Sequence, residues 1–312
     1  MTILLGKPVA EALFASSIET INKNKRQWRY IVDLFCGDNP TIQTYLRMKA
    51  KACERVGRHF LLFGQGRDPQ EIVGIVDERF LPTLQRLYSL TSYTLDDAYE
   101  LIDILGQDHR CMGFIPQLPF SPTLNEHKQK IFDRIPRHID VDGLSSDSMQ
   151  RYSQNKIDIL GATPQAAFHI LDHYNLGDIE NKKVTIVWQS ILTGIPVSQW
   201  CLRRGAKVTI WNSKGSITDV QVSCRDADII IACTGVVHLI GPDHVRHDQT
   251  QIVIDIGRGI KDGKAVGDGD FDAIADHLAA YTPVPWWVWP VTIAGIISNA
   301  CTLATMYQKT KA

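Results

Sequence analysis

The sequence predicts an α/β protein of two domains, with a doubly wound parallel sheet in the second. Four short runs rich in β-branched residues follow one another in the second half of the chain: residues 183–187, 206–211, 228–232 and 251–256. Segments of helical character separate most of these runs, and this alternation is typical of a parallel sheet covered by helices. A chain of 312 residues is also long for a single hydrophobic core, which favours two domains.

The composition is that of a globular protein and excludes several classes of function. Hydrophobic residues make up 44% of the chain and charged residues 21%, and the formal net charge is -1 at pH 7. The sequence has no long run of Lys or Arg that would follow a phosphate backbone, so no nucleic-acid partner is expected. No apolar run reaches the ~18 residues of a membrane span. Residues 1–16 lack a signal-peptide core, so a cytoplasmic protein without a membrane partner is expected.

The cysteines are scattered along the chain without a C-x-x-C pair. Neither a disulfide framework nor a metal site is indicated by this spacing, which fits a reducing compartment. They are Cys36, Cys53, Cys111, Cys201, Cys224, Cys233 and Cys301.

Six elements are expected in the first half of the chain. They are a helix over residues 8–23, a buried strand over 30–35, a helix over 41–56, a strand over 60–63 and helices over 82–90 and 94–105. In the second of these helices, Tyr45 and Lys49 are four residues apart and therefore share one face, where both can act on one ligand. A solvated helix edge with a lysine lying along it is the commoner meaning of such a pair.

Two loops at predicted strand ends carry polar residues on a rigid backbone. Residues 111–122 form a strand end broken by three prolines, which holds Gln117 at the lip of a sheet. Residues 136–144 include Asp140, Asp142 and a glycine. Polar groups fixed in this way are typical ligand-binding residues of α/β proteins, although an Asp-Gly pair also serves as a plain turn.

The run at residues 183–187 leads into Trp188, Gln189 and Ser190 and then into a helical segment. In a Rossmann-type domain, this strand-to-helix turn is the place where backbone amides bind a phosphate. The second half of the chain is therefore predicted to be a Rossmann-type doubly wound domain.

The most unusual stretch is residues 281–292, where Trp286, Trp287 and Trp289 lie between two prolines and precede the apolar segment 293–303. Proline fixes the backbone, so a rigid aromatic loop in front of a helix is expected. Three tryptophans exposed together would promote aggregation unless they line a pocket or an interface. They either form the wall or lid of a pocket or are core residues beneath a loop, and both interpretations stay open at this point.

Several motifs, in their order and spacing, resemble those of the bifunctional methylenetetrahydrofolate dehydrogenase/cyclohydrolase family over nearly the whole chain. They are residues 37–40, 43–49, 116–119, 140–144, 163–164, 190–196 and 282–294. The resemblance implies a folate-binding catalytic domain of residues 1–146 and 294–312, to which the C-terminal helix returns, and a Rossmann-type domain of residues 147–293. It also implies small-molecule substrates and a homodimer. An apparent insertion within residues 60–92 would either cover the active site or be an inert surface excursion.

The same resemblance implies roles for individual residues. Lys49 would be the general acid/base, Tyr45 would stack on and position the substrate, and Gln117 would tune the lysine. Asp142 would anchor the pteridine of tetrahydrofolate, bound as its 5,10-methylene form. Further folate contacts implied by the resemblance are Leu118, Pro119, Pro283 and Pro285.

The chain departs from the family at the cofactor site. Where the family has Gly-Arg-Ser after the first strand of this domain and glycines in the last loop, this chain has four tryptophans and a glutamine. A bulky residue in a glycine conformation costs ~1–3 kcal/mol, and the indoles would fill space that a dinucleotide uses. The lost arginine also removes a charged contact for a 2′-phosphate, so NAD(P) binding is in doubt. An acceptor pocket or altered cofactor pocket is predicted instead, formed by Trp188, Gln189, Ser190, Ser213, Trp286, Trp287 and Trp289.

Three functions are compatible with these observations. The preferred one is a tetrahydrofolate-dependent one-carbon enzyme without dehydrogenase activity, which transfers the one-carbon unit of 5,10-methylenetetrahydrofolate to a second substrate or acts like a cyclohydrolase. The alternative is an NAD(P)-dependent methylenetetrahydrofolate dehydrogenase/methenyltetrahydrofolate cyclohydrolase. The third is a catalytically silent folate-binding protein, which the presence of Lys49, Gln117 and Asp142 disfavours.

Overall fold

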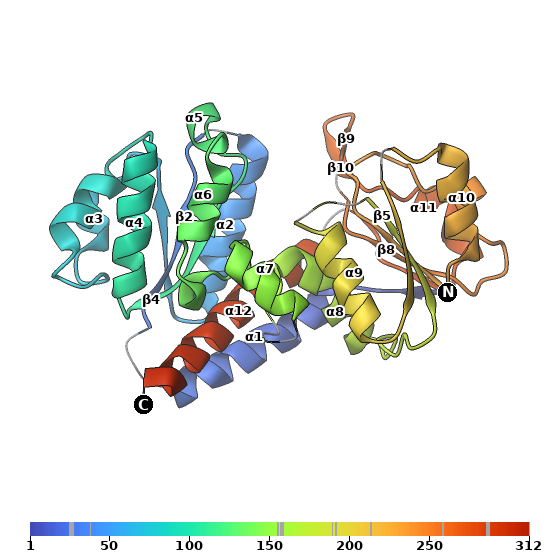
Figure 1. Cartoon of the computed structure of the whole chain (residues 1–312), viewed down its shortest axis with the longest axis horizontal. Helices are drawn as coiled ribbons and strands as arrows, with labels where there is room; N and C mark the ends of the chain where they lie inside the picture. The colour runs from blue at the N-terminus through green and yellow to red at the C-terminus, as the bar shows by residue number, and fades with distance from the viewer. Residues whose placement is uncertain are drawn as a thin grey trace. The chain divides into compact units, whose positions relative to one another are not determined.

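The computed structural model describes the chain except residues 25–27, 38, 155, 157–158, 189, 191, 213, 258, 285–287 and 312. The described chain divides into two compact units (Figure 1). Met1–Ala12 and Gly161–Gly295 form the six-strand unit, and Leu13–Leu160 and Ile296–Ala312 form the three-strand unit. Helices alternate with the strands of a parallel sheet in both units, which confirms the predicted α/β class.

The sheet of the three-strand unit has the order β3-β2-β4, with all strands parallel. The central strand β2 (Tyr30–Leu34) is buried along its whole length between β3 (His59–Phe63) and β4 (Cys111–Pro116). Helices α2 (Pro40–Arg55) and α4 (Leu95–Gln107) lie on opposite sides of β2 (Figure 1). Alternate residues of β2 therefore face different helices, because successive side chains of a strand point to opposite faces.

The ends of α4 follow from its sequence. The Thr94 side chain accepts a hydrogen bond from the Asp97 amide, and the Asp97 carboxylate accepts one from the Thr94 amide, which forms a capping box. The helix expected over residues 94–105 is confirmed and continues to Gln107. The unit also contains most of α1 (Gly6–Lys23) and the short elements α5 (Pro122–Asn125), α6 (Lys128–Arg134), η2 (Arg137–Ile139) and α7 (Ser146–Ser153).

The segment that the sequence marked as an insertion is part of the core of the three-strand unit. It contains the 3-10 turn η1 (Pro69–Ile72) and the helix α3 (Leu81–Tyr88). Leu84 and Leu87 are fully buried, and the ring of Tyr88 meets Phe63 edge-on at 4.9 Å between centroids. The expectation of an inert surface excursion is therefore wrong for these residues, because their burial helps to hold the sheet.

The sheet of the six-strand unit has the order β1-β11-β8-β7-β5-β6, and all its pairs are parallel. The strands are β1 (Thr2–Ile3), β5 (Lys183–Val187), β6 (Lys207–Trp211), β7 (Ile229–Ala232), β8 (Ile252–Asp255) and β11 (Ala280–Tyr281). Helices α9 (Gly194–Arg203) and α10 (Ile217–Asp226) lie on opposite sides of β5 (Figure 1), which is the doubly wound arrangement. The remaining elements are α8 (Ala162–His173), η3 (Pro242–His244), β9 (Gly259–Lys261), β10 (Lys264–Val266), α11 (Phe271–Ile274) and η4 (Ala275–His277).

The boundaries of the units differ from the predicted domain boundaries at three places, of which the last is a shift of two residues, from 294 to 296. Residues 1–12 belong to the six-strand unit, because β1 pairs with β11 in the register Thr2↔Ala280 and adds an edge strand to that sheet. Residues 147–160 belong to the three-strand unit. There Ser145 caps α7 and the Ser148 hydroxyl donates to the buried Asp140 carboxylate at 2.7 Å, which keeps the helix with that unit.

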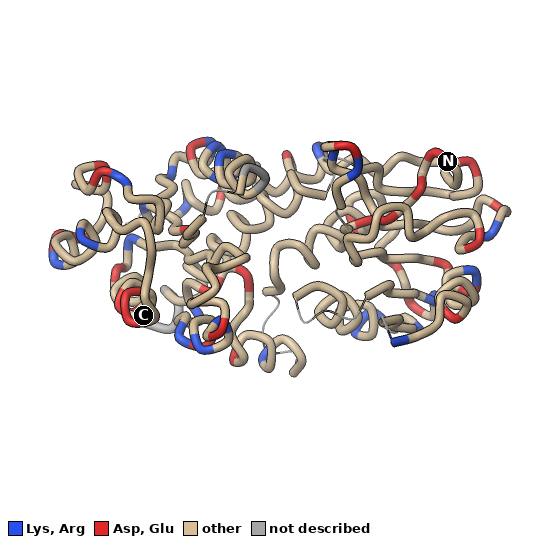
Figure 2. The backbone as a smooth tube through the Cα atoms, turned by 90° about the horizontal axis from the view of Figure 1, so that it is seen from above, with Lys and Arg blue, Asp and Glu red and all other residues tan. Residues whose placement is uncertain are grey.

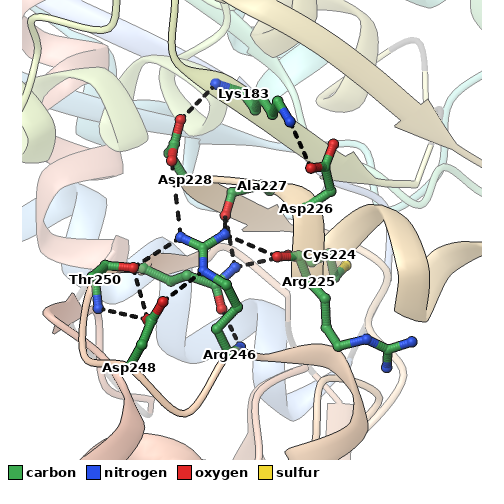
Figure 3. A network of polar contacts seen from close by, with 10 residues as sticks. Lys183, Cys224, Arg225, Asp226, Ala227, Asp228, Arg246, Asp248 and Thr250 are labelled. Carbon is green, nitrogen blue, oxygen red and sulfur yellow. Dashed lines mark hydrogen bonds and ion pairs between the residues drawn. The ribbon is translucent and has the colours of Figure 1, made fainter.

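Arg246 joins several segments at the amino ends of the strands in the six-strand unit (Figure 3). Its Nη1 donates to the carbonyl oxygens of Arg225 at 2.9 Å and Ala227 at 2.7 Å. Its Nη2 and Nε donate to Thr250 Oγ1 at 2.9 Å and Asp248 Oδ2 at 3.0 Å. These bonds tie the end of α10 to the loop before β8. Ligands of such sheets bind at the opposite, carboxyl edge, so this network is structural.

The C-terminal helix α12 (Val288–Lys311) begins earlier than predicted. Trp289 therefore lies in the first helical turn and not in a loop, because a proline such as Pro290 is tolerated in the first turn, where its amide would have no helical partner. Among the described residues, Val288–Tyr307 is the helix long and apolar enough to cross a membrane, but most of it is buried, as in the core helix of a globular protein.

Charged residues of both signs are interspersed along the chain, as Figure 2 shows. Several pair at the surface, such as Lys183 with Asp226 at 2.6 Å and Lys23 with Glu19 at 2.6 Å. Exposed pairs of this kind each contribute at most about 1 kcal/mol, so the two hydrophobic cores dominate the stability of the fold.

Candidate active site

Lys49 lies at the centre of a buried polar cluster in the three-strand unit. Its side chain is only 3% exposed, although it belongs to a helix that carries several exposed cations. The Nζ atom lies 2.5 Å from Asp33 Oδ2 and 2.6 Å from Gln117 Oε1. It also lies 4.7 Å from the centroid of the Tyr45 ring. The helical spacing of Tyr45 and Lys49 thus places both on the buried face of α2, and the solvated-edge interpretation is wrong for this pair.

Gln117 is held by the end of β4. Its backbone amide continues the ladder by donating to Leu34 O at 3.1 Å, and its Nε2 donates to Leu118 O at 2.8 Å. Because Nε2 is fixed on the chain, Oε1 faces Lys49. The amide therefore presents a neutral acceptor to the lysine, while Asp33 presents a charged one.

The loop after η2 contains Asp140 and Asp142, which have different surroundings. Asp140 is buried, and its carboxylate accepts the amides of Leu144 at 3.0 Å and Ser145 at 3.1 Å, so it shapes the turn. Gly143 has φ +60°, which a side chain would strain. Asp142 is half-buried and lies within electrostatic reach of the Lys49 cluster, because its charge acts on both Tyr45 and Asp33.

Asn299 on α12 fixes the same loop from the other end of the chain. Its Nδ2 donates to Val141 O and to Leu160 O, each at 2.8 Å, and its side chain is buried. Two distant segments of the three-strand unit thus share one donor group. The sequence analysis missed this residue, since a single asparagine within an apolar helix carries no signal of its partners.

Asp33 was also missed, and it is the charged partner of Lys49. It sits in the middle of β2 and is fully buried. Burial, followed by the nearby Asp142 charge, raises the pKa of Asp33 to about 6, although the Lys49 ammonium lowers it. A carboxylate inside an otherwise apolar strand was the available signal, because Asp is almost never fully buried unless paired.

Burial and the nearby carboxylates raise the pKa of Tyr45, so the phenol stays neutral across the physiological range. It can therefore contact a ligand through an apolar ring and a neutral hydroxyl. Of the further predicted folate contacts in this unit, Leu118 is half-buried and Pro119 is exposed. Pro283, in the six-strand unit, is half-buried, whereas Pro285 lies outside the described residues.

The predicted acceptor pocket in the six-strand unit is only partly described. Trp188 follows β5 with φ +105°, and its backbone amide donates to Trp211 O at 3.0 Å. The Ser190 hydroxyl accepts the amides of Thr193 at 3.0 Å and Gly194 at 3.3 Å, so the chain itself caps the start of α9. Gln189, Ser213, Trp286 and Trp287 lie outside the described residues.

The strand-turn-helix from β5 to α9 is the arrangement that binds a dinucleotide phosphate, and the fold in this respect fits NAD(P). Trp188 departs from this arrangement, because an indole stands where close approach of the backbone to a ligand needs a small residue.

Two buried aspartates hold other loops at the carboxyl edge of the same sheet. Asp268 accepts the amides of Thr234 and Gly235, the latter at 2.8 Å, and Asp255 accepts that of Gly269 at 2.8 Å.

A cavity of about 710 Å³ also lies in the six-strand unit, beside the hairpin of β9 and β10. Its lining includes His238, Asp270, Lys264, Phe271 and Val284. It contains none of the predicted site residues. The sequence had indicated no ligand site there, because the lining comes from segments without a recognisable motif.

Comparisons with known proteins cover the whole chain. The family model described as tetrahydrofolate dehydrogenase/cyclohydrolase, NAD(P)-binding domain, matches residues 161–308. The bifunctional protein FolD of Lacticaseibacillus paracasei is 30% identical over 305 residues, which are 97% of each chain. The crystal structure of the bifunctional enzyme FolD, methylenetetrahydrofolate dehydrogenase/cyclohydrolase, from Campylobacter jejuni has a TM-score of 0.82 at 29% identity, over 98% of this chain and 99% of that one. The bifunctional 5,10-methylenetetrahydrofolate dehydrogenase/cyclohydrolase from Thermoplasma acidophilum has a TM-score of 0.83 at 25% identity, over 99% of this chain and 100% of that one.

Proposed function

Since the chain belongs to the bifunctional methylenetetrahydrofolate dehydrogenase/cyclohydrolase family, we propose that it oxidises 5,10-methylenetetrahydrofolate and hydrolyses the methenyl product. The observation that carries the proposal is the buried Lys49, whose Nζ lies 2.6 Å from Gln117 Oε1 and faces the ring of Tyr45. The relatives support the dehydrogenase/cyclohydrolase alternative of the sequence analysis more than its preferred transferase. A buried amine beside a neutral acceptor suits proton transfer, which a silent binding protein does not need.

Both halves of the proposed reaction act at one carbon. Addition of water to a methenyl group requires a base for the water proton, and opening of the adduct requires an acid for the ring nitrogen. Lys49 can act in both steps because its Nζ can take the water proton as an amine and then give a proton to the ring nitrogen as an ammonium. Asp33 and Gln117 hold Nζ in place by accepting its hydrogen bonds. Tyr45 and Asp142 would bind the pteridine. NAD(P), when bound by the six-strand unit, supplies the hydride acceptor for the oxidation.

The test uses one substitution and a matched control on the same helix. Lys49→Met should abolish hydrolysis of methenyltetrahydrofolate, followed by the loss of its absorbance, while folate binding measured by calorimetry persists. Lys51→Met is the control, because Lys51 is exposed on α2 and outside the cluster. Equal hydrolysis by both variants and the unmodified protein would remove Lys49 from the proposed role.

A second candidate keeps the folate chemistry but lacks the oxidation, as a one-carbon transferase or a cyclohydrolase alone. The observation in its favour is Trp188 with φ +105° after β5, together with the Ser190 hydroxyl that already caps the first amides of α9. An indole at this turn competes with a dinucleotide for space. The six-strand unit would then bind the substrate that accepts the one-carbon unit, in place of a dinucleotide.

Nucleotide binding separates the two candidates. Micromolar binding of NADP or NAD by calorimetry, with reduction that depends on methylenetetrahydrofolate, supports the bifunctional enzyme. Hydrolysis without any nucleotide binding supports the second candidate, and Trp188→Gly should then create measurable dinucleotide binding. The homodimer implied by the family resemblance is a separate proposal, which sedimentation equilibrium tests directly.

A further inference from the structure

We propose that Asp33 is the internal proton acceptor of the active site, taking a proton from Lys49 while Lys49 takes one from the attacking water. Asp33 is thus a positioning and proton-holding residue that acts through Lys49. This inference rests on the proposed hydrolysis and adds a residue to it.

The Asp33 carboxylate is enclosed in the core beside Lys49. Its side chain is fully buried, and its Oδ2 lies 2.5 Å from Nζ of Lys49, which is its side-chain hydrogen-bond partner among the described residues. The second oxygen, Oδ1, is buried without a hydrogen-bond partner among the described residues. An ionised carboxylate with an unsatisfied oxygen is costly in a dry interior, so a proton arriving from Lys49 relieves that cost.

The charges around the pair are few. From α2, the cation Lys49 and the neutral groups of Tyr45 and Cys53 face Asp33, and from the loop after η2 it senses Asp142. Its neighbours on the flanking strands are apolar, since Asp33 pairs in register with Leu62 on β3 and Ile115 on β4. Lys49 is therefore the cation beside Asp33, and Asp142 is a second negative charge that acts on the same carboxyl group.

A buried ion pair such as that of Asp33 with Lys49 is weak evidence of a stabilising role. Replacing a buried ion pair by apolar residues is often neutral or stabilising. The position of Asp33 in the centre of β2 also holds its carboxylate rigidly, because strands on both sides fix the backbone. A rigid acceptor behind an amine is suited to proton transfer.

A water oxygen bonds to the methenyl carbon, one water proton passes to Lys49 Nζ, and one Lys49 proton passes to Asp33 Oδ2. In the second step the bond from that carbon to the ring nitrogen breaks, the nitrogen takes a proton from Lys49, and Lys49 takes the hydroxyl proton of the adduct. Asp33 then returns its proton through Lys49 to solvent, which accounts for the single proton released by hydrolysis.

The test compares Asp33→Asn with the unmodified protein and with Asp96→Asn, an exposed aspartate of the same unit. Asparagine keeps the shape and can still accept a hydrogen bond from Lys49, but it cannot take its proton. We expect kcat for methenyltetrahydrofolate hydrolysis to fall roughly 10²-fold, with KM unchanged. The unmodified enzyme and Asp96→Asn should lose activity as pH falls through about 6, where Asp33 becomes protonated and can accept no further proton. Asp33→Asn should lack this limb.

A second measurement does not depend on activity. Infrared difference spectra of the unmodified protein should contain a buried carboxylic-acid C=O band that titrates near pH 6 and is absent from Asp33→Asn. If Asp33→Asn keeps the normal kcat and pH profile, or no such band titrates, the relay is wrong. If the unmodified protein does not hydrolyse methenyltetrahydrofolate while the band is present, the proposed function fails and the proton-holding pair remains.

Discussion

Trp188→Gly provides a direct measure of backbone strain at the start of the nucleotide-like turn. The backbone of Trp188 has φ +105°, where a side chain costs ~1–3 kcal/mol and glycine costs almost nothing. The indole is half-buried, so its removal should lose roughly half of the ~3–5 kcal/mol typical of a core tryptophan. The two effects oppose each other and are similar in size. We therefore expect the free energy of unfolding to change by less than about 1 kcal/mol.

Trp200→Ala is the matched comparison in the same unit. The Trp200 ring stacks on Phe168 with centroids 3.8 Å apart, and it lies in the interior of α9, where no strain is relieved by its removal. We expect a loss of about 2–3 kcal/mol for this variant. Urea unfolding followed by circular dichroism gives both values. If Trp188→Gly is destabilised as much as Trp200→Ala, the strain assigned to Trp188 is absent and its indole is a core residue.

Three further predictions concern stability. Asn299→Ala should cost about 2–4 kcal/mol, because two buried carbonyl groups lose their donor, whereas Thr302→Ala on the exposed face of α12 should change the melting temperature little. Arg246→Met should lower the free energy of unfolding by about 1–3 kcal/mol in urea titrations, since the Arg225 carbonyl loses its side-chain donor and the Ala227 carbonyl keeps only that of Gln251; an unchanged midpoint would contradict this. Because the pKa of Asp33 is raised on folding, its protonation stabilises the folded state fully below the ordinary carboxyl pKa, and this contribution is lost as pH rises through about 6. In urea titrations at several pH values, the free energy of unfolding of the unmodified protein should therefore show this decline, and that of Asp33→Asn should lack it.

Elements with a local signal could be predicted, and contacts between distant segments could not. The β-branched runs became the parallel strands β5, β6, β7 and β8, of which β5, β7 and β8 are mostly buried and β6 is the edge strand. Lys49 and Gln117 were identified by a helix face and a strand end, and the family resemblance gave them roles. Asp33 was read as one position of an apolar strand, since its partner lies on another element.

Other errors have equally physical causes. Trp289 was placed in a loop because Pro290 was read as a helix breaker, although a first turn tolerates proline. The strand β1 is only Thr2–Ile3, and such a short strand is created by its partner β11, which the sequence of residues 1–5 cannot indicate. The core positions of residues 69–88 likewise depend on α4 and β3, against which they pack.

The division of the chain has a consequence for its synthesis. The polypeptide passes from one unit to the other after residues 12, 160 and 295, so neither unit is a continuous stretch of sequence. A nascent chain that ends before Asn299 lacks the donor for Val141 O and Leu160 O, and the loop bearing Asp142 is then incompletely held. The three-strand unit, most of which is translated before α12, can therefore complete its native hydrogen bonds only after Asn299 has left the ribosome.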